Sequence, residues 1–346
     1  MTEEEIVELL NKGKIVAFPT DTVYGLIALP TEENAEKIYE FKNRDRNRPI
    51  GLFLPEKESL KQFISFDFNK IEKIASFWPG ALTLVLPVKE SAFPFLQKNG
   101  KLGFRIPDSP LLLKVLKKTG PLLQTSANIS GKPTPVTSWE IESVFKNRVF
   151  VVEGKAGNLF STVLEYQNNE WKVLRKGSIP IVKIKKETGA QIFLSDELNV
   201  LFLCTGNIER SPMAEAIGRA LLKDLPVKIR SRGIFPGGAP YSKIAQKAVE
   251  NLGYEKIEGK SKEISEEDLR WADLVLVMEK KHIEFIEGNF PQFKDKVFLL
   301  SDDDIPDPMG LGEKTHQMVA KIIESSLKTR WLEFIKSFFK QHRGEA

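Results

Sequence analysis

Residues 199–225, NVLFLCTGNIERSPMAEAIGRALLKDL, decide the fold of the second half of this chain. The run NVLFL is continuously apolar and has the length of a buried strand, and a Gly-containing loop and a helical segment follow it. Further along, the apolar strands VKIRSRG (227–233), DLVLVM (273–278) and KVFLL (296–300) alternate with helical segments. This order predicts a small doubly wound parallel α/β sheet, whose ligands lie beyond the carboxyl ends of its strands.

The loop that begins at Cys204 has an anion-binding pattern. Cys204 and Arg210 stand at the two ends of a short loop between a buried strand and a helix N-terminus. Backbone N–H groups, the helix dipole and Arg210 can together bind three phosphoryl oxygens, and the same positive field favours the Cys204 thiolate. We expect the Ser211 hydroxyl to donate to the thiolate and the Asn207 side chain to fix the shape of the loop. The candidate phosphate loop also contains Thr205, Gly206 and Ile208.

A thiolate that attacks phosphorus needs an acid to protonate the leaving oxygen. The segment SDDDIPDPMG (301–310) follows KVFLL and offers Asp307 in a loop fixed by prolines, so Asp307 is the expected general acid. Two plainer interpretations stay open at this point. Cys204 can be a small buried core residue, and Asp307 can be a turn residue beside Pro308.

The segments CTGNIERSPMAEAI, ADLVLVMEKKH and DIPDPMG resemble the low-molecular-weight protein tyrosine phosphatase family over about residues 198–340. The resemblance implies a protein-tyrosine-phosphatase that works through a cysteinyl-phosphate intermediate on a phosphoprotein substrate. It also implies that Cys204 is the nucleophile, that Arg210 binds the phosphoryl group and that Asp307 is the general acid.

Two departures from that family leave the substrate open. Glu209 stands where a second cysteine often protects the first, and Met309-Gly310 stands where aromatics usually stack on the substrate ring. Bacterial protein-arginine phosphatases resemble the same family but tend to have Thr at the position of Ile208, which favours phosphotyrosine here. An arginine phosphatase, or an inactive phosphate-binding domain disabled by Glu209, is the alternative.

The first half of the chain predicts a separate twisted α/β sheet domain. Strand-like KIVAFPT (14–20), ALTLVLPV (81–88), KLGFRIP (101–107) and RVFVVEG (148–154) alternate with three helix-like segments. These helical segments are NAEKIYEFKNR (34–44), FNKIEKIASFW (68–78) and SPLLLKVLKKTG (109–120).

Polar motifs punctuate this half. PTDTVYGL (19–26) sets hydroxyls beside a strand end, and QTSANISGKPTP (124–135) combines small polar residues with a glycine that lets backbone approach phosphates closely. KNRDRNRP (42–49) is a basic cluster able to neutralise a triphosphate, although a solvated helix end is the plainer interpretation. The other motifs are KLGFRIPDSP, FSTVLEY and VLRKGSI.

Together these segments resemble the YrdC family of threonylcarbamoyl-AMP synthases along residues 5–185. The resemblance implies a nucleotidyltransferase that forms threonylcarbamoyl-AMP from L-threonine, bicarbonate and ATP for threonylcarbamoyladenosine in tRNA, with downstream transfer machinery as a partner. Catalysis would rest on positioning and on the charges of Lys42, Arg44 and Mg²⁺, without a protein nucleophile. By resemblance, Thr22, Arg105, Ser126 and Ser161 hold threonine, and Lys42, Arg44, Arg48, Asn128 and Arg175 hold ATP.

Length and composition set the remaining expectations. The 346 residues suggest two domains, which we place at 1–190 and 198–346, with a linker at 191–197. The stretch just before this linker shows no helical stripe of apolar residues. The single cysteine excludes a thiolate zinc site, no protein metal site is expected, and all three histidines (His282, His316 and His342) lie in the last quarter. The acidic start MTEEEIVELL and the short apolar runs predict a cytoplasmic protein outside the membrane. The net charge of +4 leaves weak RNA binding, or an RNA-binding N-terminal module, as an alternative.

Overall fold

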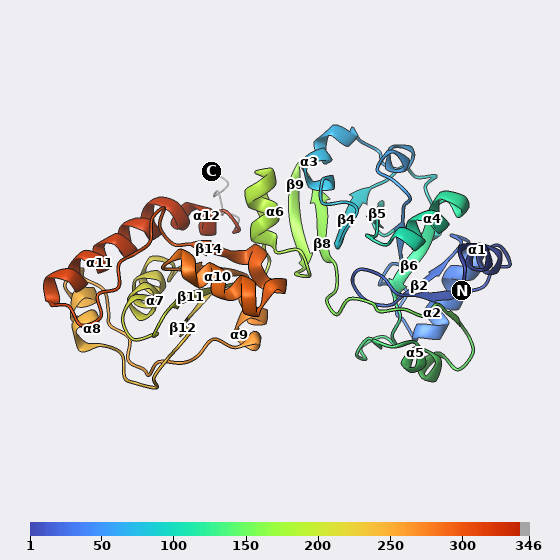
Figure 1. Cartoon of the computed structure of the whole chain (residues 1–346). Helices are drawn as coiled ribbons and strands as arrows, with labels where there is room; N and C mark the ends of the chain where they lie inside the picture. Colours follow the sequence, from blue (N-terminus) through green and yellow to red (C-terminus); the bar gives the residue numbers. More distant parts are fainter. Residues whose placement is uncertain (340–346) are drawn as a thin grey trace. The chain divides into compact units, whose positions relative to one another are not determined.

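The structure is a computed structural model that describes residues 1–339, so His342 lies outside the described residues. The chain divides into two compact units, each a sheet covered by helices (Figure 1). The first unit is Met1–Ile179 with Thr188–Ala190, and the second is Pro180–Glu187 with the chain from Gln191 onward. Both units are mixtures of α and β structure, as the sequence predicts. Among residues 1–339, no helix is long and apolar enough to span a bilayer.

The first unit contains a mixed sheet with the strand order β9-β8-β4-β5-β3-β6-β2-β1-β7. Its strands are β1 (Val16–Phe18), β2 (Gly25–Ala28), β3 (Gly51–Phe53), β4 (Leu82–Pro87), β5 (Lys101–Arg105), β6 (Leu122–Ser126), β7 (Phe150–Val151), β8 (Thr162–Gln167) and β9 (Glu170–Arg175). Its helices are α1 (Glu3–Asn11), α2 (Glu32–Lys42), α3 (Glu72–Ala75), α4 (Pro110–Thr119) and α5 (Ser138–Phe145), with short 3₁₀ turns η1 (Glu58–Gln62), η2 (Phe68–Lys70) and η3 (Pro94–Leu96). Parallel and antiparallel strand pairs are mixed in this sheet. Polar residues at the ends of different strands therefore meet within the unit as well as at one edge of the sheet.

The core of the first unit lies where α1 and α4 cover the sheet. Ile6 and Leu10 of α1 and Leu112 and Leu116 of α4 are fully buried against Phe18 and its neighbours. Burial of each such side chain stabilises the fold by roughly 2 kcal/mol. This packing holds in place the strands whose ends carry the polar motifs. The capping box of Thr2 and Glu5 explains why α1 begins where it does.

The second unit contains a parallel four-stranded sheet in the order β12-β11-β13-β14. Its strands are β11 (Leu198–Cys204), β12 (Val227–Gly233), β13 (Leu274–Val277) and β14 (Val297–Leu299), with the short strand β10 (Ile192–Phe193) before them. Its helices are α6 (Ile181–Thr188), α7 (Arg210–Leu221), α8 (Lys243–Glu250), α9 (Glu266–Trp271), α10 (Lys280–Asn289), α11 (Glu313–Ser326) and α12 (Leu332–Lys336), with the 3₁₀ turn η4 (Pro291–Lys296) and the π turn η5 (Leu327–Trp331). One face packs Leu201, Val275 and Val277 against Ile286 of α10 and Leu269 of α9.

Three predicted elements differ from those observed. The stretch before residue 191 was predicted to lack a helical stripe, but α6 forms there because Pro180 starts the helix, Gly189 at φ +66° follows it, and Ile181, Val182 and Ile184 are buried. The predicted helix 68–78 shortens to η2 and α3. From residue 313 onward, apolar residues recur at helical spacing and predict one packed terminal helix, but η5 divides this segment into α11 and α12.

Candidate active sites

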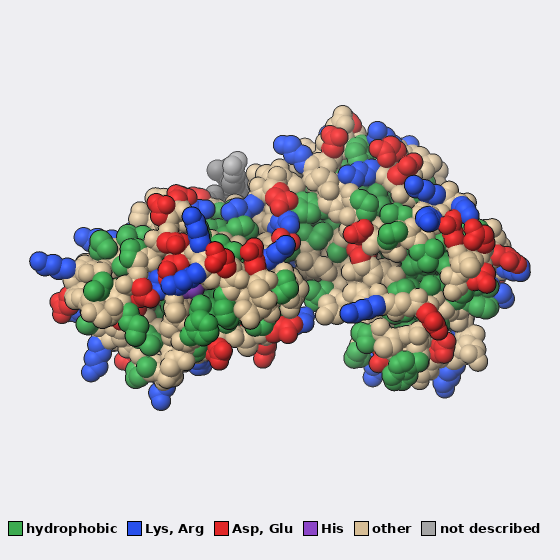
Figure 2. All heavy atoms as spheres, viewed as in Figure 1, with side chains coloured by type: hydrophobic (Ala, Val, Ile, Leu, Met, Phe, Trp, Pro, Cys, Tyr) green, Lys and Arg blue, Asp and Glu red, His purple; other side chains and the backbone are tan. Residues whose placement is uncertain are grey.

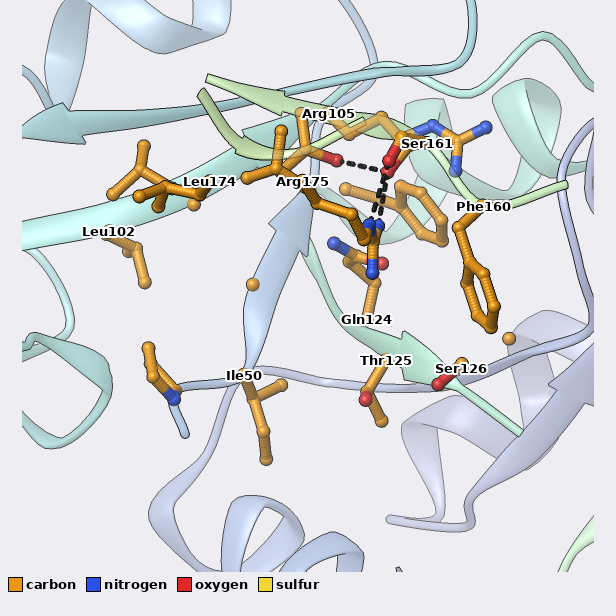
Figure 3. Close-up of a pocket in the computed structure, with 18 of the residues that line it drawn as sticks. Ile50, Leu102, Arg105, Gln124, Thr125, Ser126, Phe160, Ser161, Leu174 and Arg175 are labelled. Carbon is orange, nitrogen blue, oxygen red and sulfur yellow. Dashed lines mark hydrogen bonds between the residues drawn. The ribbon is translucent and has the colours of Figure 1, made fainter. Parts of the chain in front are cut away.

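A cavity of about 470 Å³ lies in the first unit among β2, β3, β4, β5, β6, β8 and β9. All four predicted threonine ligands line it: Thr22, Arg105, Ser126 and Ser161. Figure 3 shows Arg105, Ser161 and Arg175 close together, Thr125 and Ser126 across the cavity, and the apolar Ile50, Leu102 and Leu174 toward one side. The cavity therefore offers a polar, cationic region and a neighbouring apolar region to one ligand or to two adjacent ligands.

The side chain of Arg105 is buried in the wall of this cavity and fixed by three hydrogen bonds. It is 3% exposed, and its guanidinium donates to Thr22 Oγ1 at 2.7 Å, to Asp21 Oδ1 at 2.6 Å and to the Gly80 carbonyl at 2.9 Å. Burial lowers the pKa of Arg105, and the carboxylate of Asp21 opposes that change. An arginine has five N–H donors, so two remain for a ligand carboxylate.

Arg175 and Ser161 form a second polar group. Arg175 donates to Ser161 Oγ at 2.9 Å and to the Ser161 carbonyl at 3.0 Å, and Ser161 Oγ lies 2.8 Å from Thr83 Oγ1. Burial, followed by repulsion from Arg105 and Arg44, lowers the pKa of Arg175. The cavity therefore concentrates cations, and binding an anion there relieves their repulsion.

The predicted ATP ligands divide into two groups. Arg44 and Arg175 line the cavity, whereas Lys42, Arg48 and Asn128 are not among its lining residues. Arg44 donates to the backbone carbonyls of Arg48 and Pro49, at 2.9 and 3.1 Å, so Arg48 contributes its backbone to the position of Arg44.

Lys42 is fully buried behind the loop that follows β6. Its Nζ donates to the Ser126 carbonyl, to the Asn128 carbonyl at 2.6 Å and to Asn128 Oδ1 at 3.1 Å. Burial, followed by repulsion from Arg44, lowers the pKa of Lys42 to about 7. Asn128 in turn accepts from Ser126 Oγ at 2.6 Å. Lys42 and Asn128 thus fix the loop that presents Ser126.

The phosphate loop of the second unit runs from Cys204, at the end of β11, to Ser211 in the first turn of α7. Asn207 adopts φ +51°, and its amide donates to Ser211 Oγ at 3.0 Å and Ser231 Oγ at 2.9 Å, while its Oδ1 accepts from the Lys262 N–H at 2.9 Å. The residue beside Cys204 on β12 is Gly233, where a Cβ would stand 2.8 Å from the Asn207 nitrogen and the Thr205 carbonyl. Two features therefore hold the shape of the loop: the hydrogen bonds of the Asn207 side chain, and the close approach of the loop backbone to Gly233.

Cys204 is 2% exposed at the bottom of this loop. Its Sγ lies 3.0 Å from Ser211 Oγ and accepts from the Asn207 N–H at 3.2 Å. These two contacts hold the sulfur at the closed end of the loop, between the first turn of α7 and the loop backbone.

Arg210 connects the loop to two other segments, one at Glu279 and one at Ile305 and Asp307. Its guanidinium donates to Glu279 Oε1 at 2.5 Å, to the Ile305 carbonyl at 2.9 Å, to Thr205 Oγ1 at 3.3 Å and to the carboxylate of Asp307. The structure thus brings the predicted nucleophile loop, phosphoryl ligand and acid together from segments about a hundred residues apart.

His282 and Glu279 are site residues that the sequence analysis did not identify. His282 is fully buried, accepts from the Glu279 N–H at Nδ1 (3.2 Å) and lies 3.0 Å from Thr205 Oγ1 at Nε2. Burial, followed by the charge of Arg210, lowers the pKa of His282 to about 4, so the ring is neutral and Nε2 donates to Thr205. Asp21 and Thr83 of the first unit were missed likewise. In the sequence, the only signals for these residues are that Asp21 precedes Thr22 and that Glu279 directly follows the strand ADLVLVM.

The mouth of the second site has an apolar rim. Phe235 follows β12, is 68% exposed and donates its N–H to the Thr205 carbonyl at 2.9 Å, while Met309 and Leu311 of the acid loop are also exposed. Phe235 supplies an aromatic ring beside the phosphate loop, whereas Met309-Gly310 stands after Pro308 where related phosphatases usually carry aromatics. On the face shown in Figure 2, acidic and basic side chains are interspersed over both units.

Comparisons with known proteins match each half separately. The model of the Sua5/YciO/YrdC family, described as "Telomere recombination", matches residues 8–177, and the model described as "Low molecular weight phosphotyrosine protein phosphatase" matches residues 199–341.

Relatives with curated names match the first half. A threonylcarbamoyl-AMP synthase of Pyrococcus abyssi is 35% identical over 190 residues, which are 52% of this chain and 55% of the relative. That of Photobacterium profundum is 32% identical over 162 residues, which are 44% of this chain and 87% of the relative. The chain thus spans about half the length of the Pyrococcus relative. The crystal structure of P. abyssi Sua5 complexed with L-threonine matches 93% of this chain and 94% of its own at 22% identity and a TM-score of 0.52, which shows a shared fold alone.

Proposed function

This chain belongs to the Sua5/YciO/YrdC family and also carries a low-molecular-weight phosphotyrosine protein phosphatase domain, and from that premise we propose that it is a bifunctional enzyme. Both families are families of enzymes. The first unit forms threonylcarbamoyl-AMP from L-threonine, bicarbonate and ATP, and the second hydrolyses protein phosphotyrosine. The domain boundaries proposed for these activities are 1–190 and 198–346.

The observation that supports the synthase is the concentration of guanidinium groups beside hydroxyls in one cavity. Arg105 and Ser161 line the cavity and would bind the carboxylate and amine of threonine, while Arg44 and Arg175, which also line it, would supply charge for the phosphates. In the reaction, a carbamate oxygen of carboxylated threonine attacks the α-phosphorus, and the bond to pyrophosphate breaks. The fixed cations stabilise the negative charge that leaves with pyrophosphate, which needs no nucleophilic side chain.

The expected Mg²⁺ has no ready protein site in this cavity. The carboxylate among the lining residues belongs to Glu165, and Lys101 pairs with it at 3.0 Å, while nearby Asp21 pairs with Arg105. The residues present therefore do not fit a resident metal ion. Mg²⁺ would enter as the counter-ion of ATP, and the product would pass to the machinery that transfers the threonylcarbamoyl group to tRNA.

Threonine-dependent release of pyrophosphate from ATP tests the synthase. The Arg44→Ala variant should lose about 100-fold in kcat/KM because a positioned cation is removed from the cavity. Arg46→Ala is the matched control, since Arg46 belongs to the same basic run but is exposed and pairs with Glu36. An RNA-binding module would release no pyrophosphate with threonine, and that result would reject the synthase.

The observation that supports the phosphatase is the phosphate loop with Cys204 and Arg210 at its ends and Asp307 beside it. The thiolate attacks phosphorus, the bond to the tyrosyl oxygen breaks, and Asp307 gives that oxygen its proton. Water then attacks the cysteinyl phosphate, Asp307 takes the proton, and the thiolate returns. Because a thiolate nucleophile must stay reduced, we propose the cytoplasm as the compartment.

Hydrolysis of p-nitrophenyl phosphate tests the phosphatase. We expect turnover that Cys204→Ser abolishes. Asp307→Ala should lower kcat, because no base then takes the proton of the water that attacks the cysteinyl phosphate. Phosphotyrosine and phosphoarginine peptides then distinguish the proposed substrate from the alternative, and the exposed ring of Phe235 supports phosphotyrosine through stacking. An intact chain that binds phosphate without turnover would be a phosphate-binding domain instead.

A further inference from the structure

Glu209 lies inside the phosphate loop but is not bonded to the loop's arginine. Its Oε2 lies 2.5 Å from Nε2 of His316 on α11, and the two side chains are 12% and 1% exposed. The contacts described above for Cys204 Sγ are with Ser211 and Asn207. The carboxylate of Glu209 is therefore committed to a partner on another helix.

His316 bonds acceptors at both of its ring nitrogens. Nδ1 lies 3.1 Å from the carbonyl of Gly312, which can only accept, and Nε2 faces the carboxylate of Glu209. The ring of His316 is therefore held at both nitrogens, by the Gly312 carbonyl on its own helix and by Glu209 of the phosphate loop. Removing either side chain would leave a buried polar group of the other without its hydrogen bond.

The pair joins the two loops that perform the proposed phosphatase reaction. Gly312 is the N-cap of α11 and ends the short loop that begins at Asp307, where the Met309 N–H donates to Asp307 Oδ1 at 3.2 Å and the Leu311 N–H to the Pro308 carbonyl at 2.9 Å. Glu209 is the N-cap residue of α7, next to Arg210. A chain of contacts thus runs from the phosphate loop through His316 to the base of the acid loop.

A second contact between these loops would compete with the substrate. Arg210 donates to Asp307 in this structure, and a phosphoryl group that accepts from the same guanidinium competes for its donors. The contact between Glu209 and His316 uses neither Arg210 nor the sulfur, so a bound phosphoryl group does not compete for it.

We propose that the Glu209–His316 contact positions Asp307 for its proton transfer, which makes Glu209 a supporting residue of the phosphatase and not a disabling one. This inference rests on the proposed phosphatase function. Glu209 and His316 are positioning residues, because they act on the reaction only through the placement of Asp307.

The test compares two leaving groups in the full-length chain. p-Nitrophenolate departs without needing a proton, whereas phenolate needs one, so only phenyl phosphate hydrolysis depends strongly on a well-placed acid. We expect His316→Gln and Glu209→Ala to lose about tenfold in kcat/KM on phenyl phosphate and less than about twofold on p-nitrophenyl phosphate, with Asp307→Asn as the reference for a missing acid. The double variant should fall no further than either single one.

Two controls separate positioning from damage to the loop. Competitive inhibition by inorganic phosphate should stay unchanged in both variants, since the phosphate loop keeps its own contacts. Glu215→Gln is the matched substitution, because Glu215 is also a buried carboxylate of α7 but pairs with Arg219 on the same helix. It should lower neither substrate's rate.

Each other outcome overturns the inference in a recognisable way. Equal losses on both substrates with weaker phosphate inhibition would mean that the pair only builds the phosphate loop. Unchanged rates on both substrates would mean that Asp307 is held without it. A wild-type chain that hydrolyses neither substrate would instead reject the phosphatase, and with it this role of the pair.

Discussion

At the scale of single residues, both sites depend on buried guanidinium groups that are paired with carboxylates. In the first unit, Arg105 and Asp21 are 4% and 16% exposed at the side chain, and Asp21 compensates a guanidinium that is almost removed from water. In the second, Arg210 is shared between Glu279 and Asp307. Such pairs contribute little to the net free energy of unfolding. Loss of one partner is strongly destabilising, because the other charge then stays buried without a partner.

Asp21→Asn should therefore impair the synthase even though Asp21 was not among the predicted ligands. We expect a loss of roughly 3 kcal/mol in transition-state binding, about 100-fold in kcat/KM for threonine, because Arg105 loses the partner that orients it. Steady-state pyrophosphate release at varied threonine measures this. Glu165→Gln removes the other paired carboxylate of the cavity, at 21% exposure, and should cost far less. Equal losses in the two variants would refute the special role of the Asp21 pair.

His282 makes the stability of the second unit depend on pH. Burial lowers the pKa of this ring from its ordinary value of 6.5 to about 4, so the unfolded chain binds the proton first as the pH falls. The stability that the neutral ring contributes is complete above about pH 6.5 and is lost as the pH falls toward 4, by roughly 3 kcal/mol.

Urea unfolding of wild type and His282→Gln at pH 7 and pH 4.5, followed by hydrogen exchange in the second unit, checks this dependence. Gln can keep the hydrogen bonds to Glu279 and Thr205 but does not titrate. The variant should lose clearly less stability than wild type between the two pH values. The same pH slope in both proteins would show that His282 is not the titrating group.

At the scale of elements, the helix α6 belongs with the second unit. Lys183 pairs with Asp295 at 2.8 Å, Lys185 donates to the Ser337 carbonyl at 3.1 Å, and the ammonium of Lys186 lies 4.1 Å from the ring centre of Phe298. Cation–π contacts and a buried lysine side chain therefore bind this helix to the second unit, although half of its residues are charged.

The sequence predicted those parts of each site that are continuous in the chain and missed those that tertiary packing assembles. The segment from β11 through the Cys204 loop to α7 could be predicted because strand, loop and helix signals follow one another within 27 residues. The helix α6 was missed because its buried face consists of Ile and Val with lysine stems, which resemble neither a clean stripe nor a strand. Likewise Glu279 and His282 meet the loop only through the packing of α10.

Phosphatase fragments that begin before or after α6 should differ in stability. A fragment from Pro180 keeps the contacts of Lys183 and Lys186, and we expect its Tm to exceed that of a fragment from Gln191 by at least about 5 °C. Thermal unfolding followed by circular dichroism gives both values, and p-nitrophenyl phosphate turnover confirms the fold. Identical Tm values would show that α6 does not stabilise the second unit, and would support the predicted boundary at residue 190.

At the scale of the whole molecule, each unit has its own sheet, its own buried core and its own site. One core centres on α1 and α4 around Phe18, and the other on the sheet face below α9 and α10 around Val275. Both proposed reactions are complete with residues of one unit, because the cavity lining and the phosphate-loop contacts each come from a single unit. A fusion of this kind guarantees equal numbers of the two sites, but it does not require that one site alter the other.

Inactivation of one site should therefore leave the other unchanged. We expect Cys204→Ser to keep threonine-dependent pyrophosphate release within about twofold of wild type, and Arg105→Ala to keep p-nitrophenyl phosphate turnover within the same range, since twofold corresponds to less than about 0.5 kcal/mol. The assays should be repeated with phosphate present in the first case and with ATP and threonine in the second, because coupling between sites appears as an effect of one ligand on the other's binding. A change of fivefold or more would correspond to a coupling free energy of about 1 kcal/mol, and it would make the phosphatase a regulator of the synthase instead of a second activity on the same chain.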